Sequence, residues 1–159
     1  MPVFSAKLSE IDELIKELKV YKAKVEAAPR KIVEELAEVG RSEIQGNLGA
    51  ITDVDGNHIA GSGKEVNGNK AVAFMNGSQA SFLEFGTGIQ GQSSPHPDAN
   101  KHGWEYNTGA TIVNNRWRYY DPFINQFVVT SGIPAQMPVL RAANEVRSQA
   151  SKVAKEALK

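Results

Sequence analysis

The chain has 159 residues, and its 18 lysines and arginines balance its 18 aspartates and glutamates, so the formal net charge is zero. The length suits one domain, or one domain with an arm, and a neutral chain is not expected to bind nucleic acids through an excess of positive charge. The lack of cysteine excludes disulfides and thiolate metal sites, and the lack of a basic start followed by an apolar run, or of about 18 consecutive apolar residues, predicts a soluble cytoplasmic protein.

The N-terminal segment, residues 1–28, is predicted to form a helical arm. Its apolar residues recur at spacings of three and four, which places them on one stripe of an α-helix. They are Leu8, Ile11, Leu14, Ile15, Leu18, Tyr21 and Val25. The charged residues between them are expected on the solvated face.

A second helix is expected to begin near Pro29, because proline breaks a helix interior but is tolerated in the first turn. This helix would bury the apolar residues Ile32, Val33, Leu36, Ala37, Ile44 and Leu48. Gly40 interrupts the pattern, which predicts close packing or a bend. Residues 29–159 would then form one domain.

Residues 50–132 have frequent glycine and asparagine and short apolar runs, which indicates strands and turns. The pair Asn67-Gly68 predicts a hairpin between residues 64–66 and 70–75, and Asn76-Gly77 predicts a second turn. Further strand candidates are Thr111–Val113 and Trp117–Tyr120 around a turn at Asn114-Asn115, and then Gln126–Thr130. Together they predict a small antiparallel sheet.

Residues 86–103 contain glycines, serines and prolines but few apolar side chains, which predicts a long loop. This loop offers too little apolar surface to offset its ordering cost, so we expect it to be mobile in the free chain and ordered only by a neighbour. A C-terminal amphipathic helix follows, with the apolar residues Leu140, Ala143, Val146, Ala150, Val153 and Leu158. The element order predicts an α+β fold with this helix packed on the sheet.

Motifs for metal binding are weak. Residues 53–57 faintly resemble a calcium loop but lack its glycine at the sixth position and its glutamate at the twelfth, which favours a polar turn. The histidines are His58, His96 and His102, and two of them share the long loop with Asp98. A zinc enzyme could use His96, Asp98 and His102, but their spacing fixes no geometry. We therefore predict a solvated loop, with no metal and no cofactor.

Motifs for catalysis and nucleic-acid binding are also weak. Gly86, Gly88 and Gly91 match the glycine pattern of dinucleotide-binding sites, but no β-α crossover surrounds them. No set of residues in the sequence has the pattern of a catalytic site. A nucleic-acid-binding strand is an alternative function, because its aromatic residues could stack on bases. It would use Arg116, Trp117, Arg118 and Tyr119, although the alternation equally predicts aromatics facing inward and arginines facing water.

Two stretches carry a resemblance to a known family. They are Ala80-Ser-Phe-Leu-Glu-Phe-Gly-Thr-Gly88 and Ser131-Gly-Ile-Pro-Ala-Gln-Met-Pro-Val-Leu-Arg-Ala-Ala143. In order and approximate spacing they resemble the neck or tail-completion proteins of long-tailed bacteriophages, the gene-product-ten family of lambdoid phages. The resemblance covers residues 32–146 with gaps. This chain has one additional residue, Met137, before the second proline of the family's Pro-Ala-Gln-Pro pattern.

The resemblance implies a virion structural protein that joins the phage head to the tail and is not an enzyme. It implies a ring of copies with six-fold symmetry, or twelve-fold symmetry nearer the portal. The implied partners are the head connector or stopper protein and the tail-tube or tail-terminator protein. Assembly would take place in the host bacterial cytoplasm, without a membrane, and DNA would pass through the ring without sequence-specific binding.

The motif residues are expected to be structural. They are Phe82, Leu83, Glu84, Phe85, Gly86, Thr87, Gly88, Pro134, Ala135, Gln136, Pro138, Leu140 and Arg141. Residues 82–85 are predicted to form a core strand, and Glu84 is either a water-facing edge residue or a buried acid whose candidate partner is Arg141. We also expect one core to contain Phe82, Phe85, Leu140 and Ala143.

Overall fold

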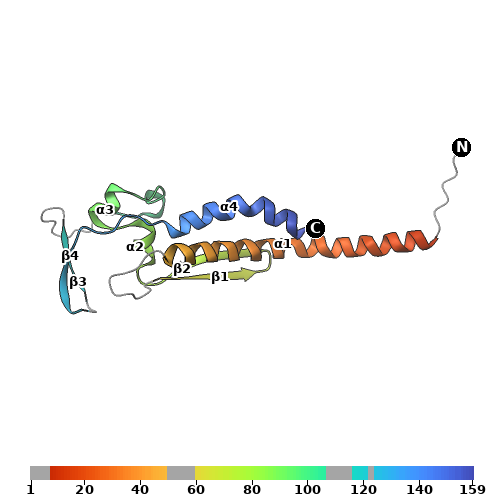
Figure 1. The fold of residues 1–159 in the computed structure, drawn as a ribbon, viewed down its shortest axis with the longest axis horizontal. Coiled ribbons are helices and arrows are strands. Elements are labelled where there is room, and N and C mark those ends of the chain that lie inside the picture. Colours follow the sequence, from red (N-terminus) through yellow and green to blue (C-terminus); the bar gives the residue numbers. More distant parts are fainter. Residues whose placement is uncertain (1–7, 50–59, 107–115, 122–123) are drawn as a thin grey trace.

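The computed structural model describes residues 8–49, 60–106, 116–121 and 124–159. Its elements are α1 (Leu8–Gly49), β1 (Gly61–Asn67), β2 (Lys70–Asn76), α2 (Ala80–Phe85), α3 (Gly88–Ser93), the short 3-10 helix η1 (Asn100–His102), β3 (Trp117–Asp121), β4 (Gln126–Thr130) and α4 (Pro138–Ala157). Figure 1 shows an elongated molecule built along α1. The fold is mixed α+β, as the sequence predicts.

The helix α1 is continuous through Pro29, so the predicted break there is wrong. The proline ring has a backbone angle that suits a helix, but it removes one N–H donor, at a cost of about 3 kcal/mol in a helix interior. Pro29 is exposed, so water can hydrate the carbonyl of Val25 that loses its partner. The surrounding alanines, glutamates and lysines favour a helix, and residues 28–48 are held by packing.

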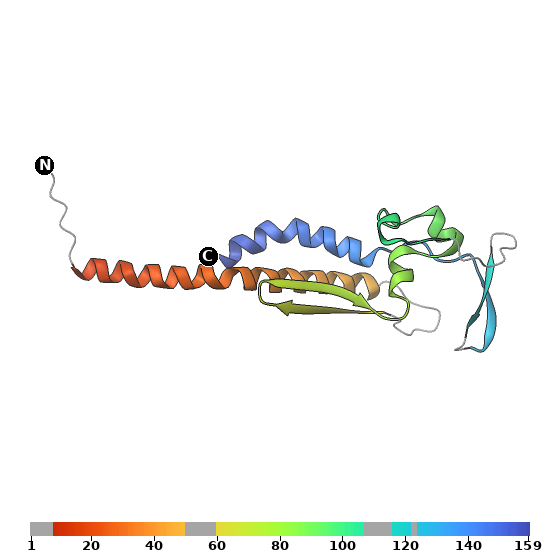
Figure 2. The ribbon, with the colours of Figure 1, turned by 180° about the vertical axis from the view of Figure 1, so that it is seen from behind.

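The C-terminal helix α4 and the hairpin β1–β2 both lie along the second half of α1, on different sides of it (Figures 1 and 2). The main partner of α4 is therefore α1, and not the sheet that the sequence suggests. Both neighbours contact the same stretch of α1 around Gly40. Gly40 lets them approach closely, because a Cβ atom there would lie 2.9 Å from the Cβ of Ala73 in β2 and 3.3 Å from the Cγ2 of Val146 in α4.

Two separate antiparallel hairpins replace the single small sheet that was expected. The first pairs β1 with β2 through a turn at Gly68, whose φ of 58° is positive, which confirms the hairpin predicted at Asn67-Gly68. The second pairs β3 with β4, as Arg118 opposite Val129 illustrates. The turn candidate at Asn114-Asn115 and the strand candidate Thr111–Val113 lie outside the described residues.

The core forms where α1, the first hairpin, α2 and the start of α4 meet. Its buried residues are Ile44, Leu48, Leu83 and Ala142, and Ala60, Ala73, Met75, Ile133 and Val139 pack against them. A salt bridge of 2.8 Å from Lys64 in β1 to Glu38 in α1 ties the hairpin to the helix at its edge. This core occupies only the second half of α1.

The first half of α1 extends beyond this core (Figures 1 and 2). The end of α4 is marked by a hydrogen bond of 3.0 Å from Lys24 Nζ to the carbonyl oxygen of Lys159. At 1.5 Å per residue, the helix from Leu8 to Lys24 projects about 24 Å past that point. None of the helices in the described part of the chain combines the length and the hydropathy of a membrane span.

Candidate functional site

The structure brings the two family-like motifs into direct contact. The backbone N–H of Thr87 donates to the Ile133 carbonyl at 2.8 Å, and the N–H of Gln136 donates to the Leu83 carbonyl at 2.9 Å. In return, the N–H of Ile133 donates to the Thr87 hydroxyl at 3.2 Å. Motifs that lie about fifty residues apart in the sequence therefore form one local unit, which we call the motif junction.

Two glycines make this close approach possible. A Cβ atom on Gly86 would lie 2.6 Å from the backbone nitrogen of Ala135, and one on Gly132 would lie 1.9 Å from the carbonyl oxygen of Thr87. Both glycines also have positive φ angles, 77° and 89°, which side chains disfavour. The motif glycine at 86 therefore serves both the turn after α2 and the contact with the second motif.

The first motif is a helix, so the strand predicted for residues 82–85 is wrong. A short apolar run does not distinguish a strand from a buried helical turn. In the helical turn of α2, Leu83 and Glu84 are buried, while Phe82 is 43% exposed. The predicted core is correspondingly shifted: Leu83 and Ala142 occupy it, and Phe85, Leu140 and Ala143 line a neighbouring pocket of about 380 Å³.

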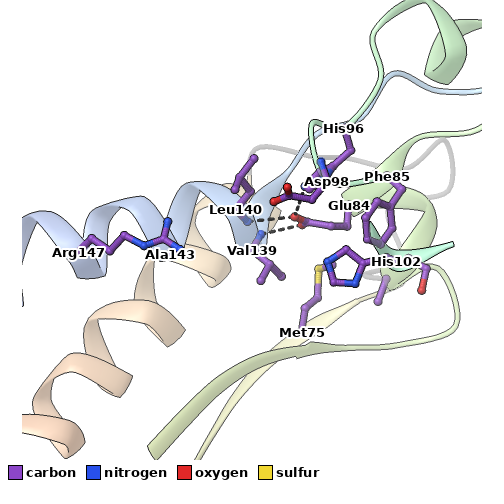
Figure 3. A pocket seen from close by; sticks show the side chains of 12 residues that line it. Met75, Glu84, Phe85, His96, Asp98, His102, Val139, Leu140, Ala143 and Arg147 are labelled. Carbon is purple, nitrogen blue, oxygen red and sulfur yellow. Dashed lines mark hydrogen bonds and ion pairs between the residues drawn. The ribbon is translucent and has the colours of Figure 1, made fainter. Parts of the chain in front are cut away.

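Glu84 is the buried acid at the centre of the motif junction (Figure 3). Its Oε2 atom accepts a hydrogen bond of 2.8 Å from the N–H of Val139, and its Oε1 atom accepts one of 3.0 Å from the N–H of Leu140. These N–H groups belong to the first turn of α4, where they have no partner inside the helix. The residue before the helix, Met137, offers no side-chain cap. Glu84 therefore caps α4 from another element, and the expected pairing with Arg141, which is exposed, is wrong.

His96 completes the environment of Glu84. Its Nε2 atom lies 3.1 Å from Glu84 Oε1, and its Nδ1 atom accepts a hydrogen bond of 3.0 Å from the N–H of Asp98. An Nδ1 atom that accepts a hydrogen bond carries no proton, so Nε2 carries it and donates to the carboxylate. His96 is only 5% exposed. The solvated loop predicted around this histidine is therefore wrong.

Residues 86–103 are folded within the single chain, so the long irregular loop expected there is wrong. They form α3 and η1, and the N–H of Gln90 donates to the Ser131 carbonyl at 3.1 Å. Aromatic side chains supply the apolar surface that the segment lacks. The Phe85 ring packs on His96, His102 and Trp104, at centroid distances of 4.8, 5.5 and 5.2 Å.

Two aromatic residues that sequence reasoning missed lie just after this segment. Trp104 Nε1 donates to the Gly86 carbonyl at 3.1 Å, and the Tyr106 hydroxyl accepts from the N–H of His96 at 2.9 Å. Each side chain is half-buried. The available signal was the placement of two large aromatics at the end of an otherwise polar segment, which is typical of side chains that cover a folded loop.

The acid and the histidine at the centre of the pocket beside Glu84 already have partners. Both oxygens of Glu84 and both ring nitrogens of His96 are occupied by the bonds described above, and Asp98 binds Lys101 at 2.5 Å. The Lys101 ammonium holds the pKa of the Asp98 carboxyl below its usual range. Within the described ranges, no group of three or more histidine and carboxylate side chains could hold a metal ion. His58 and the calcium-like residues 53–57 lie outside those ranges.

The arginine and aromatic residues of the alternative function lie on and beside β3. The Arg118 guanidinium lies 5.0 Å above the centre of the Phe127 ring of β4, so it makes a cation–π contact within the hairpin. Both Arg116 and Arg118 are exposed. Trp117 and Tyr119 belong to β3, and the positions of their side chains lie outside what the structure describes.

Comparisons with known proteins leave the chain without an assigned family. No protein-family model, no curated protein and no solved structure matches it.

Proposed function

We propose that this chain is a structural subunit of a phage neck or tail-completion ring, which joins a head connector to a tail tube by assembling with copies of itself. The motif resemblance motivates the proposal. The proposed role needs no catalysis, and Glu84 in the pocket already accepts hydrogen bonds through both carboxylate oxygens.

The observation that carries the proposal is the presence of two exposed apolar surfaces at opposite ends of the molecule, which no other described residues cover (Figure 1). One is the first half of α1, where Ile11, Leu14, Ile15, Leu18, Tyr21 and Val25 are between 41% and 60% exposed. The other is the hairpin β3–β4, where Tyr120, Ile124, Phe127 and Val129 are between 47% and 63% exposed. Large exposed apolar surfaces typically mark sites of protein association.

The second hairpin is the stronger candidate for the ring contact. Its extensive contacts are between its own two strands, so it can dock on a neighbour without opening the core. A ring needs a heterologous contact, in which one surface of each copy meets a different surface of the next. The hairpin supports this arrangement because it stands away from the core, next to the motif junction (Figure 2).

The motif junction supports the proposal in a second way. The chain leaves β4 at Thr130 and enters the junction at Gly132, where the positive φ and the close contact with Thr87 fix its path. A hairpin on a fixed base can present its apolar surface in one orientation, which a closed ring requires. The close backbone contacts of the motif junction would then serve ring assembly, because they fix the orientation of the hairpin.

Gene replacement in a phage that encodes this chain tests the proposal. Deleting the gene should leave DNA-filled heads and separate tails, as seen by electron microscopy, and the wild-type gene should restore joined virions. Phe127→Asp in the hairpin should fail to restore them, whereas Lys155→Ala on the exposed face of α4 should succeed. Normal virions without the gene would contradict the proposal.

A further inference from the structure

The projecting part of α1 carries an apolar stripe that nothing in the described part of the chain covers. We call residues Ile11–Val25 the arm and define its stripe as Ile11, Leu14, Ile15, Leu18, Tyr21 and Val25. Their spacings of three and four place them on one face. The same spacing continues through Ile32, Val33, Leu36, Ala37, Gly40, Ile44 and Leu48. The arm stripe is therefore an extension of the face that α4 and the first hairpin cover further along.

No further helix covers the stripe in the part of the chain that the structure describes. The helix α4 ends beside Lys24, where Lys159 accepts its hydrogen bond. The spacing within the stripe, alternately three and four residues through Ile11, Leu14, Leu18, Tyr21 and Val25, is that of a two-helix coiled coil. A helix from another molecule therefore fits this face better than a strand or a small ligand.

The charges of the arm indicate what that helix is. From Ile11 to Glu17 the sequence has three acids, Asp12, Glu13 and Glu17, and one lysine. From Leu18 to Val25 it has three lysines, at 19, 22 and 24, and no acid. Each arm thus has an acidic half and a basic half, divided at the middle of its stripe.

We propose that the arms of two copies of this chain pair side by side in antiparallel orientation, centred on Leu18. In this orientation the acidic half of each arm lies against the basic half of the other, with Asp12 level with Lys24 of the second copy and Glu17 level with its Lys19. A parallel pair would instead place like charges at the same level, which is unfavourable. The charge pattern is complementary to itself only when the two helices run in opposite directions.

This contact differs from the ring contact in symmetry. An antiparallel helix pair has a two-fold axis and closes after two copies, so it joins two subunits or two rings and does not build a ring. The inference goes beyond the proposed ring and does not depend on it. It can be tested on the purified chain alone, whether or not the protein belongs to a phage neck.

Single cysteines provide the test, because the wild-type chain has none. Under mild oxidation Leu18→Cys should form a disulfide-linked dimer, since the two copies of residue 18 meet at the centre of the pair. Val20→Cys is the matched control: Val20 is 61% exposed but lies on the opposite face of the helix, so this variant should form no disulfide-linked dimer. Ile11→Cys mixed with Val25→Cys should give mainly the mixed dimer.

The opposite pattern would overturn the proposal. Dimers of Ile11→Cys alone and of Val25→Cys alone, without the mixed product, would show a parallel pair. If no position on the stripe cross-links and sedimentation gives a monomer at every concentration, the arm does not bind a second copy. Circular dichroism serves as the folding control. Every variant must retain the helix content of the wild type, so that a missing cross-link cannot be due to unfolding.

A charge reversal tests the electrostatic part separately. Replacing Lys19, Lys22 and Lys24 by glutamate gives an acidic arm, and replacing Asp12, Glu13 and Glu17 by lysine gives a basic arm. Each variant alone should dimerise at least about tenfold more weakly than the wild type. Mixing the two should restore a heterodimer, and unchanged dimerisation of either variant alone would contradict the proposed pairing.

Discussion

Glu84 in α2 holds the first turn of α4, because its Oε2 atom accepts the hydrogen bond of Val139 N–H at 2.8 Å. A helix is usually capped by the residue that precedes it, but here that residue is Met137, whose side chain makes no capping hydrogen bond. The cap therefore comes from a motif about fifty residues earlier. This relationship gives the acid of the first motif a physical role, which is to fix where the last helix begins.

Glu84→Gln should lower the free energy of unfolding by about 1–3 kcal/mol, because an amide oxygen can accept only part of the bonds that the carboxylate accepts and the amide N–H₂ group would oppose the remaining donors. Chemical denaturation measures this loss. Glu43→Gln, at an exposed position of α1, is the matched control and should change stability by less than about 0.5 kcal/mol. Equal effects of the two substitutions would contradict the capping role.

Gly40 and Gly46 lie on the same helix and should respond oppositely to alanine. Gly46→Ala should stabilise the protein by about 0.5–1 kcal/mol, because alanine favours the helix and nothing lies within 4 Å of the new Cβ. Gly40→Ala should destabilise it, because the new Cβ would lie 2.9 Å from the Cβ of Ala73, an atom that cannot rotate away. Thermal unfolding compares the two, and a stabilising Gly40→Ala would show that the hairpin is not packed this closely.

Leu83→Ala should cost about 2–5 kcal/mol, because it leaves a cavity among buried residues. Phe82→Ala, one position earlier, should cost less than about 1 kcal/mol, since Phe82 is 43% exposed and makes an edge contact with Trp104. Urea denaturation of both variants distinguishes the helix described here from a strand, in which the buried face would contain Phe82. A larger loss for Phe82→Ala would contradict the helix.

Glu38 should titrate far below an ordinary glutamate. Its hydrogen bonds with Arg41 and then Lys64 lower the pKa of its carboxyl from 4.5 to about 2. Since the folded pKa is the lower one, the unfolded chain binds the proton first. The stabilisation is complete above about pH 4.5 and is lost as the pH falls towards 2.

The pKa of Glu38 can be followed by NMR. Arg41→Ala should raise it more than Lys64→Ala does, because the Arg41 bond is the larger cause, and Glu38→Gln should remove this part of the acid dependence of stability. A wild-type pKa near 4.5 would mean that the bridge between α1 and β1 does not form in solution.

The sequence predicts the elements that depend on local patterns. The hairpin at Asn67-Gly68 and the C-terminal amphipathic helix follow from residues that are close together in the chain, and both are confirmed. The contacts that define the motif junction could not be predicted, because they join distant segments. Nothing near Glu84 in the sequence indicates that His96 will bond to it, and nothing near Pro29 shows that distant packing will keep α1 helical.

The fold of residues 86–103 also depends on side chains that lie outside the segment. The polar composition of the segment indicates a loop without its own core, and none of its residues belongs to the hydrophobic core cluster. The apolar surface comes instead from Phe85, Trp104 and Tyr106, which flank the segment and pack onto it. The side chains that order the segment lie just outside its ends, so the segment's own composition does not reveal them.

The copy number of this chain per virion tests the central claim most directly. Quantitative mass spectrometry of purified virions, from a phage whose genome encodes the chain, would compare its amount with that of the portal protein. The proposed neck or tail-completion ring predicts six copies for each virion, or twelve for a ring nearer the portal. Absence of the chain from infectious virions, or an amount of hundreds of copies as expected of a capsid or tail-tube protein, would contradict the account.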